Sequence, residues 1–180
     1  MNLKPKKCRV CKVKFTPYNS LQVVCSKKCA ISYVEAQKAK KWKKEKKKLK
    51  EGLMTHKDWV KIAQKSFNSY VRERDRGKLC ISCNKLLNAK FDAGHCFPAG
   101  HYPNIRFDED NVHGQCVECN QHKHGNQAEY LLRLPARIGQ EKVDELVKRK
   151  DESNKLSIPE LQELVKEYKE KRKKLLESKN

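Results

Sequence analysis

Long hydrophobic runs are missing from this sequence of 180 residues. No apolar stretch extends beyond a few positions, and the opening residues, MNLKPKKC, contain no hydrophobic signal region. A membrane-spanning helix needs about 20 predominantly apolar residues, and a secretory signal needs an apolar segment of its own. We therefore expect neither a membrane protein nor a secreted one.

Apolar and acidic residues are both scarce. Hydrophobic residues make up 37% of the chain and charged residues 36%, whereas an ordinary globular domain has about 45–50% apolar and about 25% charged residues. One large apolar core is thereby excluded, and something else must supplement the packing. Asp and Glu number 22 against 42 Lys and Arg, a net charge of +20. Such an excess implies a polyanionic partner, and nucleic acid is the first candidate.

Cysteine supplies the missing stabilisation. Eight of the nine cysteines form close pairs: Cys8 with Cys11, Cys25 with Cys29, Cys80 with Cys83, and Cys116 with Cys119. The reducing cytosol disfavours disulfides, so such pairs indicate metal sites, and two pairs complete a tetrahedral zinc shell. We predict two structural Zn²⁺ ions in closed sites without catalytic activity. Cys96 is left over and is expected to be a small packed residue.

The sequence predicts an α+β protein of small zinc-stabilised modules. We expect a four-cysteine module over residues 1–30, a helical region over 31–78, a second zinc module over 79–130, and C-terminal helices over 131–180. Capping boxes are expected at Thr55 with Asp58 and at Ser157 with Glu160, and Pro135 and Gly139 are expected to interrupt the C-terminal helices. The last helical stripe could pack on its own domain or form a homodimer interface.

Residues 31–51 form a lysine-dominated helix whose apolar stripe is too thin to bury against a core. It could be a solvated linker, but its charge favours an arm that follows DNA phosphates, because unneutralised like charges repel along an isolated helix. The candidate DNA-binding residues of this arm are Lys40, Lys41, Lys43, Lys44, Lys47 and Lys48.

The 32 residues between the knuckles of the second module, and the few that follow, are rich in groups that do chemistry. Five of the six histidines fall between positions 95 and 124. The order Cys80-x2-Cys83, His95, Asn111-x4-Cys116-x2-Cys119-Asn120-x2-Lys123 resembles the zinc-knuckle branch of the HNH (ββα-metal) endonucleases. More narrowly, AGH at 93–95, DNVHGQC at 110–116 and GNQAEY at 125–130 are similar to the phage lambda NinG (Rap) recombination protein family. The similarity extends over residues 1 to about 150.

That resemblance implies a ββα-metal core flanked by long basic helices and a structure-selective endonuclease. Its substrates would be branched DNA in recombination, such as displacement loops and four-way junctions, in the bacterial host cytoplasm, with a recombinase partner and a homodimer as further expectations. His95 would be the general base, oriented by Asn111 through hydrogen bonds to backbone across the loop. Asn120 and an upstream oxygen donor would hold catalytic Mg²⁺ or Mn²⁺, and Lys123 and Arg106 would neutralise phosphate charge.

The chain departs from the HNH pattern immediately before the expected base. Many HNH enzymes place an acidic metal ligand there, and this sequence has Gly94. Asp92 lies three positions ahead of His95, which is on the opposite side of a regular strand. Asp92 could bind the same metal ion as the HNH acidic residue only if the strand bulges; otherwise His113 would be the metal ligand. His101 and His113 also rival His95 as the base.

Two non-enzymatic interpretations stay open. The protein could be a non-catalytic zinc protein that binds nucleic acid as a recombination accessory, with the histidine-rich insert as a contact loop. A transcription regulator is the other, but its only candidate recognition helix is the lysine arm, which suits phosphates better than base edges.

Overall fold

The computed structural model describes residues 3–179 and divides the chain into two compact units, Met1–Met54 and Thr55–Asn180. Each unit contains one cysteine tetrad, so the predicted α+β protein with two small cysteine-rich modules is confirmed. Within residues 3–179, no helix combines the length and apolar composition that a membrane crossing requires.

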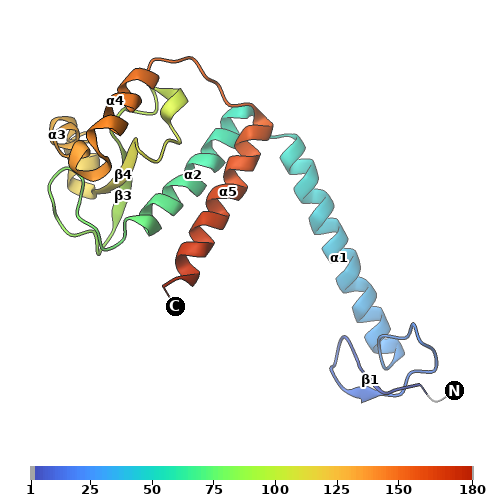
Figure 1. The fold of residues 1–180 in the computed structure, drawn as a ribbon. Coiled ribbons are helices and arrows are strands. Elements are labelled where there is room, and N and C mark those ends of the chain that lie inside the picture. Colours follow the sequence, from blue (N-terminus) through green and yellow to red (C-terminus); the bar gives the residue numbers. More distant parts are fainter. Residues whose placement is uncertain (1–2, 180) are drawn as a thin grey trace. The chain divides into compact units, whose positions relative to one another are not determined.

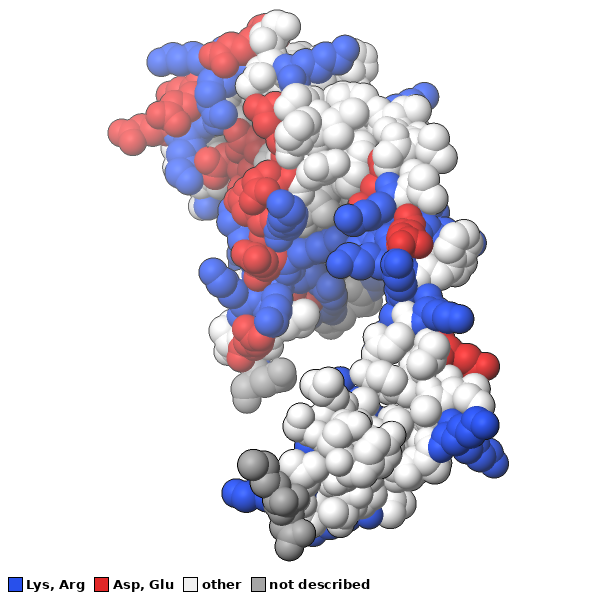
Figure 2. Space-filling model, turned by 90° about the vertical axis from the view of Figure 1, so that its right-hand side faces the viewer, with Lys and Arg blue, Asp and Glu red and all other residues white. Residues whose placement is uncertain are grey.

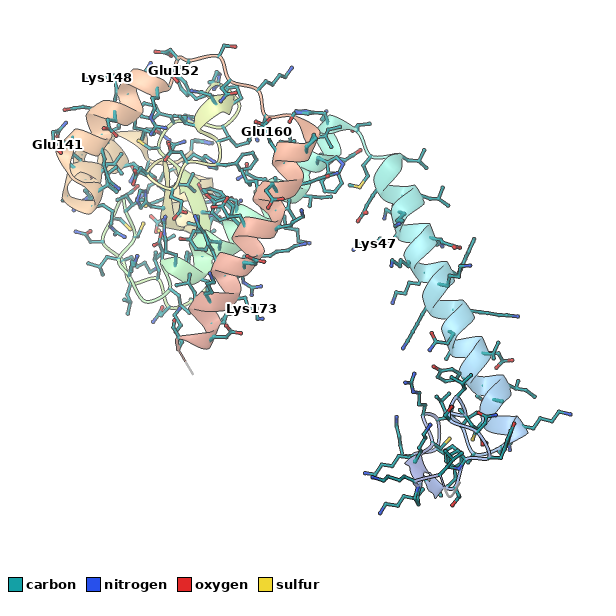
Figure 3. All side chains as sticks on the ribbon, turned by 45° about the vertical axis from the view of Figure 1, so that its right-hand side comes forward. Lys47, Glu141, Lys148, Glu152, Glu160 and Lys173 are labelled. Carbon is teal, nitrogen blue, oxygen red and sulfur yellow. The ribbon has the colours of Figure 1, made fainter. Side chains whose placement is uncertain are left out.

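The first unit pairs a small cysteine module with one long helix (Figure 1). Strands β1 (Lys6–Lys7) and β2 (Lys14–Phe15) form an antiparallel pair, and α1 follows as Lys27–Gly52. The Ser26 side chain caps α1 by accepting a hydrogen bond from the Cys29 backbone N–H. No side chain of α1 is buried, and Figure 3 shows its side chains, including Lys47, projecting outward from the helix. The predicted exposure of this helix is therefore confirmed.

In the second unit, helices α2 (His56–Arg74) and α5 (Ile158–Glu177) lie side by side and parallel (Figure 1). His56 Nε2 lies 2.7 Å from the Leu156 carbonyl oxygen at one end, and Lys179 Nζ lies 2.8 Å from Glu73 Oε1 at the other. Both predicted capping boxes are present, and in Figure 3 Glu160 lies at the start of α5.

The two helices enclose an aromatic core. The ring centroids of Phe67 and Tyr168 are 4.7 Å apart in an edge-to-face arrangement, and Tyr70 and Tyr168 are 5.2 Å apart. Such pairs add roughly 0.5–1.5 kcal/mol beyond the area that they bury. The apolar stripe of α5 therefore packs against α2 of the same chain, which is the first of the two arrangements expected from the sequence.

A two-stranded sheet lies against α2. Strands β3 (Phe91–His95) and β4 (Val112–Cys116) pair antiparallel with an unbroken register from Phe91↔Cys116 to His95↔Val112. Ala93 and Val112 join the core of α2 and α5. The strand β3 therefore has no bulge, and the bulge considered for Asp92 is absent.

One short helical turn separates the two strands and a second follows them. Helix η1 (Pro103–Ile105) lies in the connection, and the π-helical turn η2 (Glu118–His122) comes directly after β4. The Asp75 carboxylate, at the end of α2, accepts hydrogen bonds from the Gly114 N–H (2.8 Å) and from Arg74. Burial acts to raise the pKa of Asp75, but Arg74 and these hydrogen bonds hold it well below its usual range.

The residues after the sheet form α3 (Gln127–Ile138) and α4 (Gln140–Arg149). Tyr130 of α3 reaches the sheet through its hydroxyl, which donates to the Gly94 carbonyl at 3.1 Å. The buried residues of the two helices, Tyr130, Leu134, Val143 and Leu146, pack with Cys96 and two isoleucines in a second core. Gly139, with φ +89°, separates the two helices as expected. The predicted break at Pro135 is wrong, because α3 continues through it to Ile138 while Tyr130 and Leu134 hold the helix on the core.

Candidate functional site: a histidine and carboxylate region on a zinc knuckle

The four cysteines of the first unit are arranged for one metal ion. All four sulfurs of Cys8, Cys11, Cys25 and Cys29 lie within 4.8 Å of one another, with Cys11 Sγ to Cys25 Sγ at 3.5 Å and Cys25 Sγ to Cys29 Sγ at 3.7 Å. A tetrahedral shell with Zn–S bonds of ~2.3 Å requires sulfurs about 3.8 Å apart. The tetrad therefore fits Zn²⁺ as the spacing predicted.

The second tetrad joins the knuckle of residues 80–83 to the end of β4 and to η2. The sulfurs of Cys80, Cys83, Cys116 and Cys119 also lie within 4.8 Å of one another. Burial acts to raise the pKa of the Cys80 thiol, but the Cys116 backbone N–H, 3.3 Å away, and other amides lower it. A thiolate is the form that binds zinc. Zinc here would fix the end of β4 relative to the knuckle.

His95, the predicted base, ends strand β3 and is partly buried. Its Nε2 lies 3.0 Å from the Arg106 carbonyl oxygen. Because a carbonyl only accepts, Nε2 must carry the proton, and Nδ1 keeps its lone pair when the ring is neutral. Burial lowers the pKa of His95, the bond to the Arg106 carbonyl opposes this, and the Arg106 charge lowers it further. The neutral imidazole is therefore favoured.

Asn111 is fully buried and connects both sides of the loop that follows His95. Its Oδ1 accepts from the Phe97 N–H at 2.8 Å, and its Nδ2 donates to the carbonyls of Phe97 (3.1 Å) and Ile105 (3.0 Å). Ile105 immediately precedes Arg106, whose carbonyl holds the imidazole. Asn111 thus makes bonds to backbone across the loop, of the kind that the resemblance implies, and its backbone carbonyl also accepts from the N–H of Cys96, the residue after His95.

Asp92 and Asn120 lie together at the opposite end of β3. Asp92 Oδ2 accepts hydrogen bonds from Asn120 Nδ2 at 3.0 Å and from Gln121 Nε2 at 2.7 Å. One carboxylate and amide groups able to turn their carbonyl oxygens inward form a hard-oxygen donor set, which suits Mg²⁺ or Mn²⁺ held with water and phosphate. In residues 3–179, however, only the two cysteine tetrads bring three or more Cys, His or acidic ligand atoms within 4.8 Å.

The regular register places Asp92 and Gly94 on one face of the sheet and His95 on the other, towards α2. His113 faces the same side as Asp92, is buried, and has its Nδ1 3.1 Å from the Tyr130 hydroxyl. Burial lowers the pKa of His113 to about 3. The structure thus brings Asp92 and Asn120 into contact. His113 contacts Tyr130 instead, and His95 contacts neither the Asp92–Asn120 pair nor His113.

Lys123, Arg106 and the rival base His101 are on the surface or partly buried. Lys123 Nζ lies 2.9 Å from Glu118 Oε1, and Arg106 donates to the Ala99 carbonyl at 2.7 Å. The rival His101 is exposed. Cys96 is buried, and burial raises the pKa of its thiol to about 12, in agreement with a packed and unreactive residue.

The lysines of α1 are largely free of acidic partners. Lys41 and Lys47 lie 3.9 and 3.7 Å from Glu45 and Glu51, and all of these side chains are exposed. On the face drawn in Figure 2, blue Lys and Arg side chains and red Asp and Glu side chains lie side by side, so basic charge is not confined to one patch.

A basic pocket next to Asp92 was not expected from the sequence. It has a volume of about 510 Å³, and Arg72, Arg76, Lys90, Asn88 and Asp92 are among the residues that line it. Arg72 and Arg76 are four residues apart, which places them on one face of α2. The sequence could have shown that the two arginines share a face of the helix. Only the fold shows that this face lies beside the start of β3.

Comparisons with known proteins point to one family. The family model described as Bacteriophage Lambda NinG protein matches residues 1–178. A protein named Protein ninG from Escherichia phage 933W is 37% identical over 193 aligned residues, covering 97% of this chain and 96% of the relative. Protein ninG of Escherichia phage lambda is 44% identical over 122 residues, covering 68% of this chain and 59% of the relative. No solved structure matches the chain.

Proposed function

The chain belongs to the bacteriophage lambda NinG protein family, as its motifs predicted, and on that premise we propose that it is a structure-selective, metal-dependent DNA endonuclease. Its substrates are branched recombination intermediates such as displacement loops and four-way junctions. The observation that carries the proposal is the contact of His95 Nε2 with the Arg106 carbonyl, which leaves Nδ1 as a proton acceptor.

In this mechanism His95 takes a proton from the attacking water. The neutral ring is the active form, and the lowered pKa of His95 keeps it neutral at the pH of the cell. Asn111 is a positioning residue, because its three hydrogen bonds fix the loop that carries the Arg106 carbonyl. Rotation of the imidazole away from the water is thereby opposed.

Asp92 and Asn120 are the residues that would hold the divalent cation, through the carboxylate and the amide carbonyl. Asp92 and His95 lie on opposite faces of the β3–β4 sheet, so their joint action on one phosphodiester requires this region to rearrange when DNA binds. When bound, Mg²⁺ or Mn²⁺ supplies polarisation of the scissile phosphate and stabilisation of the departing oxygen. Gln121 orients the Asp92 carboxylate by its hydrogen bond of 2.7 Å. Lys123 follows η2, which contains Asn120, and the Arg106 backbone contacts His95. We assign both cations the neutralisation of neighbouring phosphates, Lys123 after release from Glu118.

Cleavage assays test the proposal directly. Purified protein with both zinc ions is incubated with labelled four-way junctions, displacement loops and linear duplex, with Mg²⁺ or Mn²⁺. We expect metal-dependent cuts near the branch point that are lost in His95→Ala. His101→Ala is the matched control, because it removes an exposed histidine of the same insert and should retain cleavage.

The result against the proposal is equally specific. Zinc content and DNA binding are measured for each variant, so that a misfolded protein is not mistaken for an inactive one. Tight binding of branched DNA by the wild-type protein without cleavage in either metal would establish the non-catalytic accessory function instead. Cleavage that survives His95→Ala but is lost in His101→Ala would reassign the base.

A further inference from the structure

The basic pocket beside Asp92 has more positive charge than its surroundings neutralise. Arg76 Nε lies 3.6 Å from Glu73 Oε2, but Glu73 is already contacted by Lys179 at 2.8 Å. For Arg72 and Lys90, the described part of the chain offers no ion pair or side-chain hydrogen bond. The charged residues that line the pocket are three cations, Arg72, Arg76 and Lys90, and one carboxylate, Asp92. The lining therefore has a surplus of two positive charges in a volume of about 510 Å³.

The neighbouring Arg74 shows that this surplus is not required by the fold. Arg74 points inward, donates to Asp75 at 2.9 and 2.8 Å, and donates to the Val112 carbonyl at 2.7 Å. Arg72 and Arg76 lie on the other face of the same turns and make no comparable contact with the sheet. Arg74 thus holds α2 on β4, while the two flanking arginines stay available to a ligand.

Phosphate is the ligand that this chemistry fits. Guanidinium groups bind phosphate oxygens through paired hydrogen bonds, and an ammonium group adds a compact charge. Among the lining residues, Phe91 is the only aromatic, and it is buried, so no ring is exposed for a base to stack on. Contacts to the backbone without base contacts recognise DNA independently of sequence.

We propose that Arg72, Arg76 and Lys90 bind a backbone phosphate of the DNA strand and thereby place the adjacent phosphodiester against Asp92 and Asn120. This inference rests on the proposed endonuclease function. Asp92 is among the residues that line the pocket, and its carboxylate contacts Asn120 on the face of the sheet away from α2. A DNA strand with one phosphate in the pocket would therefore have to pass the start of β3 to bring the next phosphodiester to the Asp92–Asn120 pair. The pocket is then the positioning half of the site, and the Asp92–Asn120 pair is the reacting half.

The test compares two pairs of charges on one helix. Arg72→Gln/Arg76→Gln removes the pocket cations, and Lys57→Gln/Lys61→Gln removes two exposed cations with the same spacing at the other end of α2. Binding of a labelled four-way junction is measured at several salt concentrations without divalent metal. At low salt we expect Arg72→Gln/Arg76→Gln to bind the junction at least about tenfold more weakly than the wild type. The slope of log affinity against log salt concentration should decrease in magnitude by about one to two. Lys57→Gln/Lys61→Gln should change both quantities little.

A second variant separates charge from geometry. Arg72→Lys/Arg76→Lys keeps both charges but loses the paired hydrogen bonds, so affinity should lie between those of the wild type and the glutamine variant. Zinc content and melting temperature confirm that each variant is folded. Equal loss of affinity in Arg72→Gln/Arg76→Gln and in Lys57→Gln/Lys61→Gln would overturn the pocket as a phosphate site. Unchanged affinity in both variants would overturn it too.

Because binding is measured without divalent metal, its result does not depend on cleavage. A wild-type protein that fails to cut DNA, together with a selective loss of binding in the arginine variant, would reject the endonuclease and retain the phosphate pocket. A wild-type protein that cuts, together with an arginine variant that binds and cuts equally well, would reject the pocket and retain the endonuclease.

Discussion

The side chain of Gln115 occupies the space beside Gly94 in which a larger residue would need to lie. A Cβ atom on Gly94 would be 2.2 Å from Gln115 Oε1 and 3.0 Å from its Cβ. Gln115 cannot easily move, because it is fully buried and its Nε2 donates to Ser82 Oγ and to the Gly125 carbonyl at 2.7 and 2.6 Å. A side chain at position 94 would therefore require Gln115 to leave its hydrogen bonds, whereas the neighbouring position on that face, Asp92, has a carboxylate.

Replacing Gly94 with the acidic residue typical of HNH enzymes should therefore damage the protein. We expect Gly94→Asp to lower the free energy of unfolding by about 1–3 kcal/mol, the usual cost of overpacking, and to give no gain in metal affinity. Thermal unfolding measures the effect. Gly100→Asp is the control, because Gly100 has open space around it and the change should cost less than about 0.5 kcal/mol. Equal melting temperatures for the two variants would contradict this account of Gly94.

His95 should titrate below the ordinary histidine value of about 6.5. Burial is the main cause, because it disfavours the charged imidazolium. NMR titration of the imidazole in the zinc-loaded protein, assigned with His95→Gln, measures its midpoint. The acidic limb of the cleavage rate should have the same midpoint, since the neutral ring is the base. A midpoint at or above 6.5 would contradict both expectations.

His113 should make stability fall as the pH is lowered. The unfolded imidazole titrates at about 6.5, whereas in the fold its pKa is about 3. Between these values the unfolded state binds more protons, so the free energy of unfolding decreases as pH falls from about 6.5 towards 3. Urea unfolding at a series of pH values measures this slope. His113→Asn lacks the titrating ring but can keep a bond to Tyr130, and it should show a shallower slope than the wild type.

Each cysteine tetrad should lose one zinc ion independently of the other. Cys8→Ser should reduce the zinc content from two ions to one and unfold the first unit, whose two-residue strands and exposed helix cannot form a core alone. Cys80→Ser should likewise remove one ion and lower the melting temperature of the second unit. Metal analysis and circular dichroism provide the readout. Cys96→Ala, which replaces a buried cysteine outside both tetrads, should retain two ions.

The lysines of α1 should contribute affinity without selecting a DNA structure. Changing Lys40, Lys41, Lys43, Lys44, Lys47 and Lys48 to Gln should reduce the salt slope of binding by up to about 0.9 for each phosphate contact that is lost. The preference for branched over linear DNA should persist. The same six positions changed to Arg keep the charge and should keep the slope. If the Gln variant retained both affinity and slope, the lysine helix would not contact DNA.

The parts of the fold that were predicted correctly depend on residues close together in sequence. The cysteine tetrads follow from pairs of nearby thiols, and the starts of α2 and α5 follow from capping boxes four residues long. The break predicted at Pro135 was wrong because packing of Tyr130 and Leu134 outweighs the local preference of proline.

Contacts between segments far apart in the sequence were much harder to predict. The separation of Asp92 from His95 followed from strand alternation, but the contact of Asp92 with Asn120 depends on the β3–β4 register and on the turn after β4. The parallel pairing of α2 with α5, and the pocket formed by Arg72 and Lys90, depend on how separate elements pack. A periodic pattern shows which face of a helix is apolar but not which element covers it.

The pairing of α2 with α5 also determines when the second unit can be completed during synthesis. Phe67, Tyr70 and Val71 share their core with Tyr168, which is made only after both strands, α3 and α4. Because the ribosome adds roughly 5–20 residues per second, the apolar face of α2 stays uncovered for several seconds before Tyr168 is made. In that interval the nascent chain has its cysteine knuckle but not its closed core. Chaperone binding or aggregation of newly made protein is therefore expected to involve α2 first.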